Sequence, residues 1–311
     1  MNTTTRRRNG DTLFRGVTLF FALSILVILL IMTVEMAVES LPSVRKFGLS
    51  FLTGSDWDAV QGNFAALPYL YGSLVSSILA ILLATPLSVG TALFITELAP
   101  RRVGAATASL VELLAAIPSV IYGLWGILVM TPWLQSTVEP FLIDHFGSLP
   151  FFQGAPYGVS MLAAVFILMI MIIPIVTSIT KEVLLAVPLS QKEAAVALGA
   201  TRWEMIRMAV LPYGRSGILG AVILGLGRAI GETMAVTMVI GNTPQISLSL
   251  LSPGYTMPSV IANEFAEATT KLHSAALMEI GLILLVVTLV INFLARLLLW
   301  SVTRRWKGGV A

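Results

Sequence analysis

Six long apolar segments constrain this chain more than any other feature of its sequence. They lie at about 14–34, 69–95, 105–130, 158–180, 217–241 and 279–300. A helix that spans a bilayer needs about 20 mostly apolar residues, and each segment is long enough. Only 11% of the 311 residues are charged, whereas soluble domains carry about a quarter. The sequence therefore predicts an all-α integral membrane protein with six transmembrane helices.

The basic residues are distributed unevenly between the connecting segments. With the N-terminus in the cytoplasm, 14 of the 19 Lys and Arg residues fall on the cytoplasmic side. Those 14 are Arg6, Arg7, Arg8, Arg15, Arg101, Arg102, Lys181, Lys192, Arg202, Arg207, Arg215, Arg304, Arg305 and Lys307. Because cytoplasmic segments are enriched in Lys and Arg, we expect both termini to be cytoplasmic. We also expect the first apolar segment to remain as a helix rather than be cleaved as a signal peptide.

Several kinds of chemistry have no residues to support them. The chain has no cysteine, and its two histidines, His145 and His273, lie far apart in polar connections. We therefore interpret both as ordinary loop residues and expect no metal site. No GxxxxGK[ST] motif is present, so the chain has no phosphate-binding loop for a nucleotide. We expect no enzyme activity, no cofactor and no nucleic-acid partner.

The connection between the fourth and fifth segments, 181–216, is more polar than the chain around it. After Pro188 it contains two Ser/Thr-x-x-Glu patterns, Ser190–Glu193 and Thr201–Glu204, on either side of Gly199. Each pattern predicts a capping box that starts a helix, and Gly199 predicts a left-handed helix end. The second helix is expected to stop before Pro212. The sequence thus predicts a helical hairpin at the inner membrane face.

Two residues of opposite charge lie within the fifth apolar segment. Arg228 and Glu232 are four residues apart, which places both on one face of a helix. Ionisable side chains at membrane depth are costly and face the bundle interior, a water-filled path or each other. One interpretation is an ion pair that fixes helix packing. The other is a path for an anion, since a guanidinium matches phosphate or carboxylate with two hydrogen bonds.

Small residues and a further acid also lie within the apolar segments. Gly227 and Gly231 form a GxxxG pattern in the fifth segment, which lets another helix approach closely. Glu112 lies in the third segment and is expected to be a second buried acid, as a packing contact in preference to a gate. The long outer connection 242–278 predicts either a short amphipathic helix at the outer surface or an ordered loop.

The cytoplasmic hairpin also carries a resemblance. Glu193, Ala194, Ala195 and Gly199, followed by Leu211-Pro212, resemble the EAA loop of ABC importer permeases. The chain departs from that pattern at Ala209, where an aliphatic residue is usual. The resemblance covers about 69–300 and implies a type I ABC importer permease fold. It also implies that the hairpin, about 188–212, is a coupling helix that docks on an ATPase subunit.

The resemblance divides the chain into three parts. Residues 1–68 form an N-terminal transmembrane helix and outer loop, 69–300 form the core permease domain, and 301–311 form a cytoplasmic tail. The segments ELLAAIPSVIYGLWG and GLGRAIGETMAVTMVIGNTPQ are similar to permease subunits of bacterial phosphate importers. That similarity implies an inner-membrane location and a translocation path at Arg228 and Glu232.

The same similarity implies three partners: a second permease subunit, a dimer of ATPase subunits and a phosphate-binding protein on the outer side. The residues themselves indicate only an oxyanion, so sulfate, molybdate and phosphonate stay open as alternative substrates. A transporter driven by an ion gradient is a different class of function, in which Glu232 or Glu112 would carry protons. Such a transporter has no need of a docked cytoplasmic hairpin, and we favour the ATP-driven class.

Overall fold

The computed structural model describes residues 3–307 as a bundle of helices, and no β-strand occurs among them. The long helices are α1 (Thr3–Phe47), α3 (Leu67–Leu93), α4 (Arg101–Ala115), α8 (Met161–Leu185), α11 (Leu211–Ile230) and α14 (Lys271–Lys307). The shorter ones are α2 (Ser50–Thr53), α5 (Ser119–Trp125), α6 (Thr131–Trp133), α7 (Glu139–Phe146), α9 (Leu189–Ala197), α10 (Arg202–Met205), α12 (Met234–Val239) and α13 (Met257–Glu264). Four π-helical turns, η1 (Phe94–Leu98), η2 (Gly126–Met130), η3 (Leu134–Val138) and η5 (Ile206–Val210), continue neighbouring helices.

Five of the described helical segments are long and apolar enough to span a membrane. They are Gly10–Phe47, Leu67–Leu98, Met161–Leu185, Arg202–Ile230 and Lys271–Trp300. A sixth span arises if the bent pair Arg101–Ala115 and Ser119–Phe146 is counted as one. The multi-pass all-helical class is therefore confirmed. The first helix is longer than predicted, because α1 continues through Pro42 to Phe47.

The third predicted span, 105–130, is not one continuous helix. Its two halves, α4 and α5, meet at 92°. Pro118 lies at the bend and precedes α5. Proline lacks an amide hydrogen and disfavours helical backbone at the residue before it, so α4 ends at Ala115. The expectation of one uninterrupted span over 105–130 was wrong.

The fifth predicted span, 217–241, is also broken. Helix α11 ends at Ile230, and α12 begins at Met234. The Gly231 amide bonds the Gly227 carbonyl at a long 3.4 Å, and the Glu232 amide bonds Ala229 only three residues back. The Glu232 carboxylate accepts from the Ala235 amide at 3.3 Å. Because a side chain replaces a backbone partner here, the helix stops and restarts.

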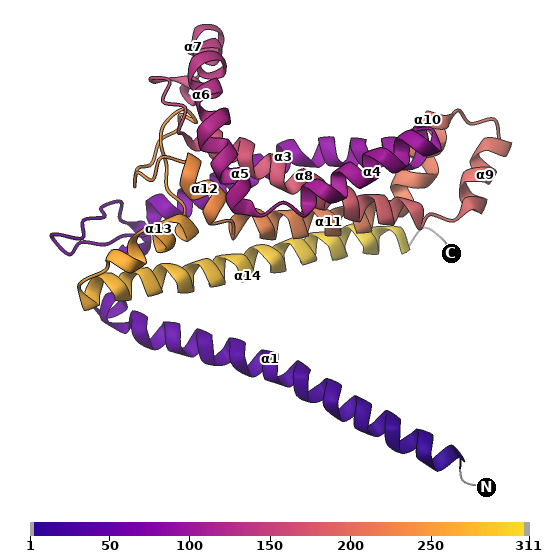
Figure 1. Cartoon of the computed structure of the whole chain (residues 1–311), viewed down its shortest axis with the longest axis horizontal. Coiled ribbons are helices and arrows are strands. Elements are labelled where there is room, and N and C mark those ends of the chain that lie inside the picture. The colour runs from indigo at the N-terminus through magenta and orange to yellow at the C-terminus, as the bar shows by residue number, and fades with distance from the viewer. Residues whose placement is uncertain (1–2, 308–311) are drawn as a thin grey trace.

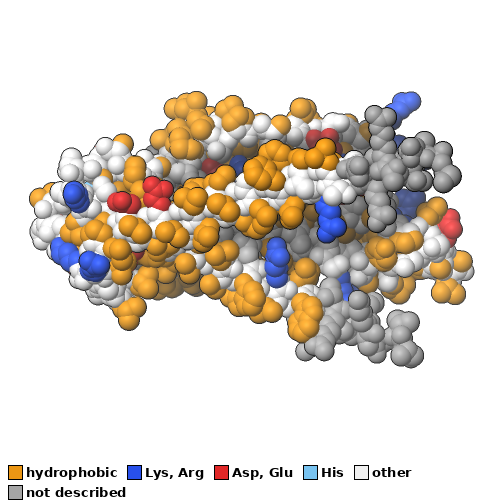
Figure 2. Space-filling model, turned by 90° about the horizontal axis from the view of Figure 1, so that it is seen from below, with side chains coloured by type: hydrophobic (Ala, Val, Ile, Leu, Met, Phe, Trp, Pro, Cys, Tyr) orange, Lys and Arg blue, Asp and Glu red, His pale blue; other side chains and the backbone are white. Residues whose placement is uncertain are grey.

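The core of the bundle lies where α3, α8 and α11 pack together (Figure 1). Small buried residues such as Ala80, Ala84 and Ala221 permit this close approach. Helix α14 runs along α11 and pairs with the C-terminal half of α1, whereas the rest of α1 leaves the bundle (Figure 1). Apolar side chains cover much of the face drawn in Figure 2, as expected for a surface in lipid. The start of α1 and the end of α14 lie toward the same end of the molecule as α9.

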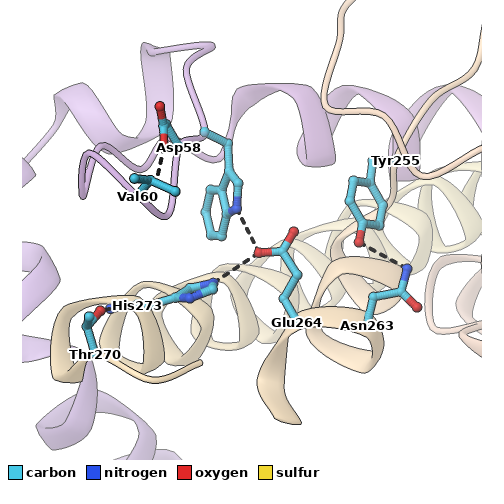
Figure 3. Close-up of polar contacts among 8 residues, drawn as sticks. Asp58, Val60, Tyr255, Asn263, Glu264, Thr270 and His273 are labelled. Atoms are coloured by element: carbon cyan, nitrogen blue, oxygen red, sulfur yellow. Dashed lines mark hydrogen bonds and ion pairs between the residues drawn. The ribbon is translucent and has the colours of Figure 1, made fainter. Parts of the chain in front are cut away.

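A polar cluster closes the opposite end of the bundle (Figure 3). One carboxylate oxygen of Glu264 accepts from the indole N–H of Trp57 at 2.8 Å and lies 3.0 Å from His273 Nε2. Phe64 stacks on the imidazole with ring centroids 5.1 Å apart. The cluster ties the loop after α2 to α13 and to the first turn of α14. His273 is buried, so its interpretation as an ordinary loop residue was wrong.

The connection 242–278 contains a helix, as one of its two interpretations expected. Met257, Pro258 and Val260 are buried in helix α13. It packs on α3 and α14. The helix is therefore held by other helices of the protein rather than lying free at a surface.

We expect Gly225→Ala to destabilise the bundle, because a Cβ atom there would lie 2.7 Å from Val176 and 3.0 Å from Ile172. Overpacking of this kind costs about 1–3 kcal/mol, and thermal unfolding of the purified subunit in detergent measures it. Gly220 is the matched control on the same helix, since a Cβ atom there has nothing within 4 Å. A lower melting temperature for Gly220→Ala than for Gly225→Ala would contradict the packing described.

Candidate translocation path and coupling hairpin

Arg228 and Glu232 lie where α11 breaks. Their charged groups are 3.6 Å apart, from Nη2 to Oε2. The two environments differ, because the Glu232 side chain is 6% exposed and the Arg228 side chain 49% exposed. The Ala235 amide holds the other Glu232 oxygen. At 3.6 Å the pair is longer than a hydrogen bond. The N–H groups of the Arg228 guanidinium therefore have room for an oxyanion as an additional acceptor, while the fixed Glu232 carboxylate orients the guanidinium.

The glycines of α11 divide into two groups. Gly217 and Gly225 face inward, where a Cβ atom would meet Val183 or Val176 at 2.5–2.7 Å. At Gly227, and at Gly231 just after α11, an added Cβ atom would have no close neighbour from another helix; the nearest such atom, on Asn292, lies 4.0 Å from the Cβ position at Gly227. The close helix contact predicted for the GxxxG pattern is therefore not made within the described chain. Its face remains open beside Arg228.

Glu112 differs from its prediction. Its side chain is 58% exposed in this chain, and its carboxylate lies 2.9 Å from Lys181 Nζ. Lys181 also contacts Glu182 at 3.2 Å. Because α4 and α8 pack side by side, this ion pair joins the two helices near their C-terminal ends. The expectation of a second buried acid was wrong, because the bend near Pro118 separates α4 from the rest of the predicted span.

The first half of the hairpin, α9, begins without the predicted capping box. The helix starts at Leu189 after Pro188, and no side chain caps its first turn. Ser190 is already inside the helix. Proline supplies the helix start in place of a hydroxyl, because its fixed φ and missing amide suit this position. The prediction of a Ser190–Glu193 box was wrong.

The end of α9 agrees with the prediction. Gly199 has φ +87°. Its amide bonds the Val196 carbonyl at 2.9 Å, and the Ala200 amide bonds Ala195 at 3.2 Å. This pair of bonds is the Schellman arrangement, which needs a left-handed residue. Gly199 is therefore the turning point of the hairpin.

The second half of the hairpin contains the predicted Thr201–Glu204 capping box. The Thr201 hydroxyl accepts from the Glu204 amide at 3.3 Å, and the Glu204 carboxylate accepts from the Thr201 amide at 2.8 Å. The helix does not stop before Pro212, however. A π-helical turn, η5, widens the backbone there, and the Leu211 amide bonds Ile206 five residues back. The widened turn accommodates the proline ring, and the hairpin continues directly into α11.

The hairpin rests on the C-terminal ends of α3 and α8. Ile206 and Val210 are buried against Ala92, Leu184 and Val187. The side chain of Trp203 is 63% exposed. The outward surface carries the EAA residues and a cavity of about 620 Å³. That cavity is lined by Gln191, Ala194, Ala195, Leu198, Gly199, Ala200, Glu204, Met208 and Ala209.

The structure is a multi-helix bundle joined to an exposed helical hairpin, and comparisons with known proteins agree with it. The family model described as binding-protein-dependent transport system inner membrane component matches residues 84–307. The chain belongs to this family.

Individual members of the family are similar over nearly the whole chain. The phosphate transport system permease protein PstC of Mesorhizobium japonicum is 46% identical over 299 residues, 95% of this chain and 91% of the relative. PstC of Haemophilus influenzae is 44% identical over 293 residues, 93% of each chain. In the solved structure of a bacterial alginate ABC transporter, one chain matches with TM-score 0.61 and 18% identity, covering 93% of this chain and 94% of that one. The expected ABC importer permease fold is confirmed.

One contact of this permease was not predicted from the sequence. Lys192 Nζ lies 2.6 Å from Glu97 Oε1, with side chains 18% and 6% exposed. Glu97 is in η1, which continues the C-terminal end of α3, and Lys192 is in α9. No pattern could pair two residues 95 positions apart. The signal available was only that both charges lie beyond the ends of predicted spans.

Gly199→Ala tests the left-handed turn. The added Cβ has nothing within 4 Å, so the whole cost comes from the backbone, about 1–2 kcal/mol. Amides of 194–200 should then exchange with solvent about 5- to 30-fold faster. Gly199→Asn should cost less, because asparagine tolerates this conformation. Equal exchange in both variants and the unchanged protein would show that the turn does not limit hairpin opening.

Proposed function

We propose that this chain is the permease subunit of an ATP-driven importer of inorganic phosphate. The observation that carries the proposal is the 44–46% identity to relatives named as phosphate transport permeases, over at least 93% of the chain. An alignment of that length includes the segment that bears Arg228 and Glu232. Residues 69–300 form the permease core, 1–68 add a helix and an outer loop, and 301–307 continue α14 beyond the core.

Arg228 is the proposed anion contact on the translocation path. Its half-exposed guanidinium offers planar donors that match two phosphate oxygens. Glu232 keeps the arginine oriented when no anion is bound, and its negative charge limits affinity so that the anion is released. The open glycine face of α11 beside Arg228 suits close packing of a second permease subunit. The path would then lie between the two subunits.

The hairpin α9–α10 is the proposed coupling element. Glu193, Ala194 and Gly199 are exposed on it, and small side chains allow close docking of an ATPase subunit. Its continuity with α11 gives a mechanical route from the hairpin to Arg228. The distribution of basic residues supports a cytoplasmic position for the hairpin and for both termini.

The proposed complex contains a PstA-like second permease, a dimer of PstB-like ATPases and a PstS-like phosphate-binding protein on the outer side. Two alternatives differ in substrate or energy source. Sulfate, molybdate or phosphonate could replace phosphate, and uptake assays with each anion discriminate them. A gradient-driven carrier is disfavoured by the exposed hairpin, and phosphate accumulation in vesicles that lack the ATPase would support that carrier.

Arg228→Gln should reduce phosphate uptake by the reconstituted complex about ten- to hundredfold, because charge-assisted hydrogen bonds contribute about 1.5–3 kcal/mol. Copurification of the partner subunits should persist. Arg296→Gln, an exposed arginine on α14, is the control and should transport normally. Loss of assembly in Arg228→Gln would instead assign the Arg228–Glu232 pair a packing role.

Glu193→Lys should release the ATPase subunits in pull-down experiments and abolish uptake, because it reverses a charge on the proposed docking surface. Asp144→Lys makes the same charge reversal on an exposed residue of α7, at the opposite end of the molecule (Figure 1). Retention of the ATPase by both variants would show that Glu193 is not part of the docking surface.

A further inference from the structure

The ion pair between Lys192 and Glu97 joins the hairpin to a helix of the core. Glu97 is the penultimate residue of the continuous segment Leu67–Leu98. Lys192 lies in the first half of α9. Their 2.6 Å contact joins α9 to the π-helical turn that continues α3. Helix α9 has no buried residue of its own, so apolar packing holds it only weakly.

The local electrostatics of both residues are unfavourable. A carboxylate near a helix C-terminus and an ammonium near a helix N-terminus each oppose the helix dipole. Glu97 and Lys192 occupy those two positions, and both side chains are largely removed from water. Each charge is therefore stabilised by its partner rather than by its own helix. Departures from local preference of this kind concentrate at functional positions.

The contact creates a second route from the hairpin to the path. One route is covalent, from α10 through η5 into α11. The other passes from Lys192 to Glu97, along α3, and into α11 where Ile81 packs at Gly225. Gly225 is three residues from Arg228 on the same helix. A rigid movement of the hairpin is thus transmitted to α3 and α11 together.

We propose that Lys192 and Glu97 are positioning residues that couple displacement of the hairpin to α3. This inference rests on the proposed function, since it requires an ATPase that moves the hairpin. The pair itself contacts neither the anion nor the nucleotide. Without it, α11 would still follow the hairpin, but α3 would lag behind and the path would open incompletely.

The experiment uses the complete complex in proteoliposomes and measures phosphate moved per ATP hydrolysed. Glu97→Gln and Lys192→Met should each lower this ratio about 5- to 150-fold, the usual range for loss of coupling between sites. The exchange variant, Glu97→Lys with Lys192→Glu, should restore most of it. Lys181→Met is the matched control, since it removes the other inner-face ion pair without touching the hairpin.

Assembly is followed in the same samples by copurification of the ATPase. An unchanged ratio in both single variants would overturn the proposal. If the single variants fail to assemble, the exchange variant decides: restored assembly with restored coupling supports the pair, and restored assembly without coupling, or no restoration, overturns it. Failure of the unmodified complex to transport phosphate would refute the proposed substrate rather than the role of the ion pair. In that case the role of the pair is tested by comparing how far the binding protein, loaded with its own ligand, stimulates ATP hydrolysis in the unmodified complex and in the variants.

Discussion

The requirement that every backbone polar group in a bilayer find a partner within the protein governs this structure. Helices meet that requirement along most of the chain, since each amide bonds a carbonyl of its own segment. The informative places are the exceptions. At Pro118, at 231–233 and in the π-helical turns the regular pattern is interrupted. At the break after Ile230, the Glu232 carboxylate supports the interruption by accepting from the Ala235 amide.

These interruptions coincide with the elements that are proposed to function in transport and in coupling to the ATPase. The break after Ile230 places Arg228 at a helix end, half exposed, beside a fixed carboxylate. The η5 turn lets α11 continue through Pro212 into the hairpin. The η1 turn carries Glu97, which holds α9. The uninterrupted pairing of α3 with α8 supplies the rigid body against which these parts act.

Local sequence patterns predicted what local interactions control. The left-handed turn at Gly199 and the Thr201–Glu204 box were both correct, because each depends on residues within a few positions. The apolar segments were found, but two of them are broken helices rather than continuous spans. The Ser190–Glu193 box failed although its pattern was equally good, since Pro188 starts the helix before Ser190. The prediction that Glu112 is buried failed because its burial depends on the direction of α4, which the bend at Pro118 sets.

The sequence by itself determined the membrane class, the number of apolar segments and the residues of the hairpin. Periodicity and composition report how each segment interacts with lipid and with its immediate neighbours. Only the tertiary structure decided that Lys192 meets Glu97, that His273 is buried with Glu264 and Trp57, and that one glycine face of α11 stays open. These features join residues distant in sequence, and their geometry follows from how the helices bend and pack, which no local pattern encodes.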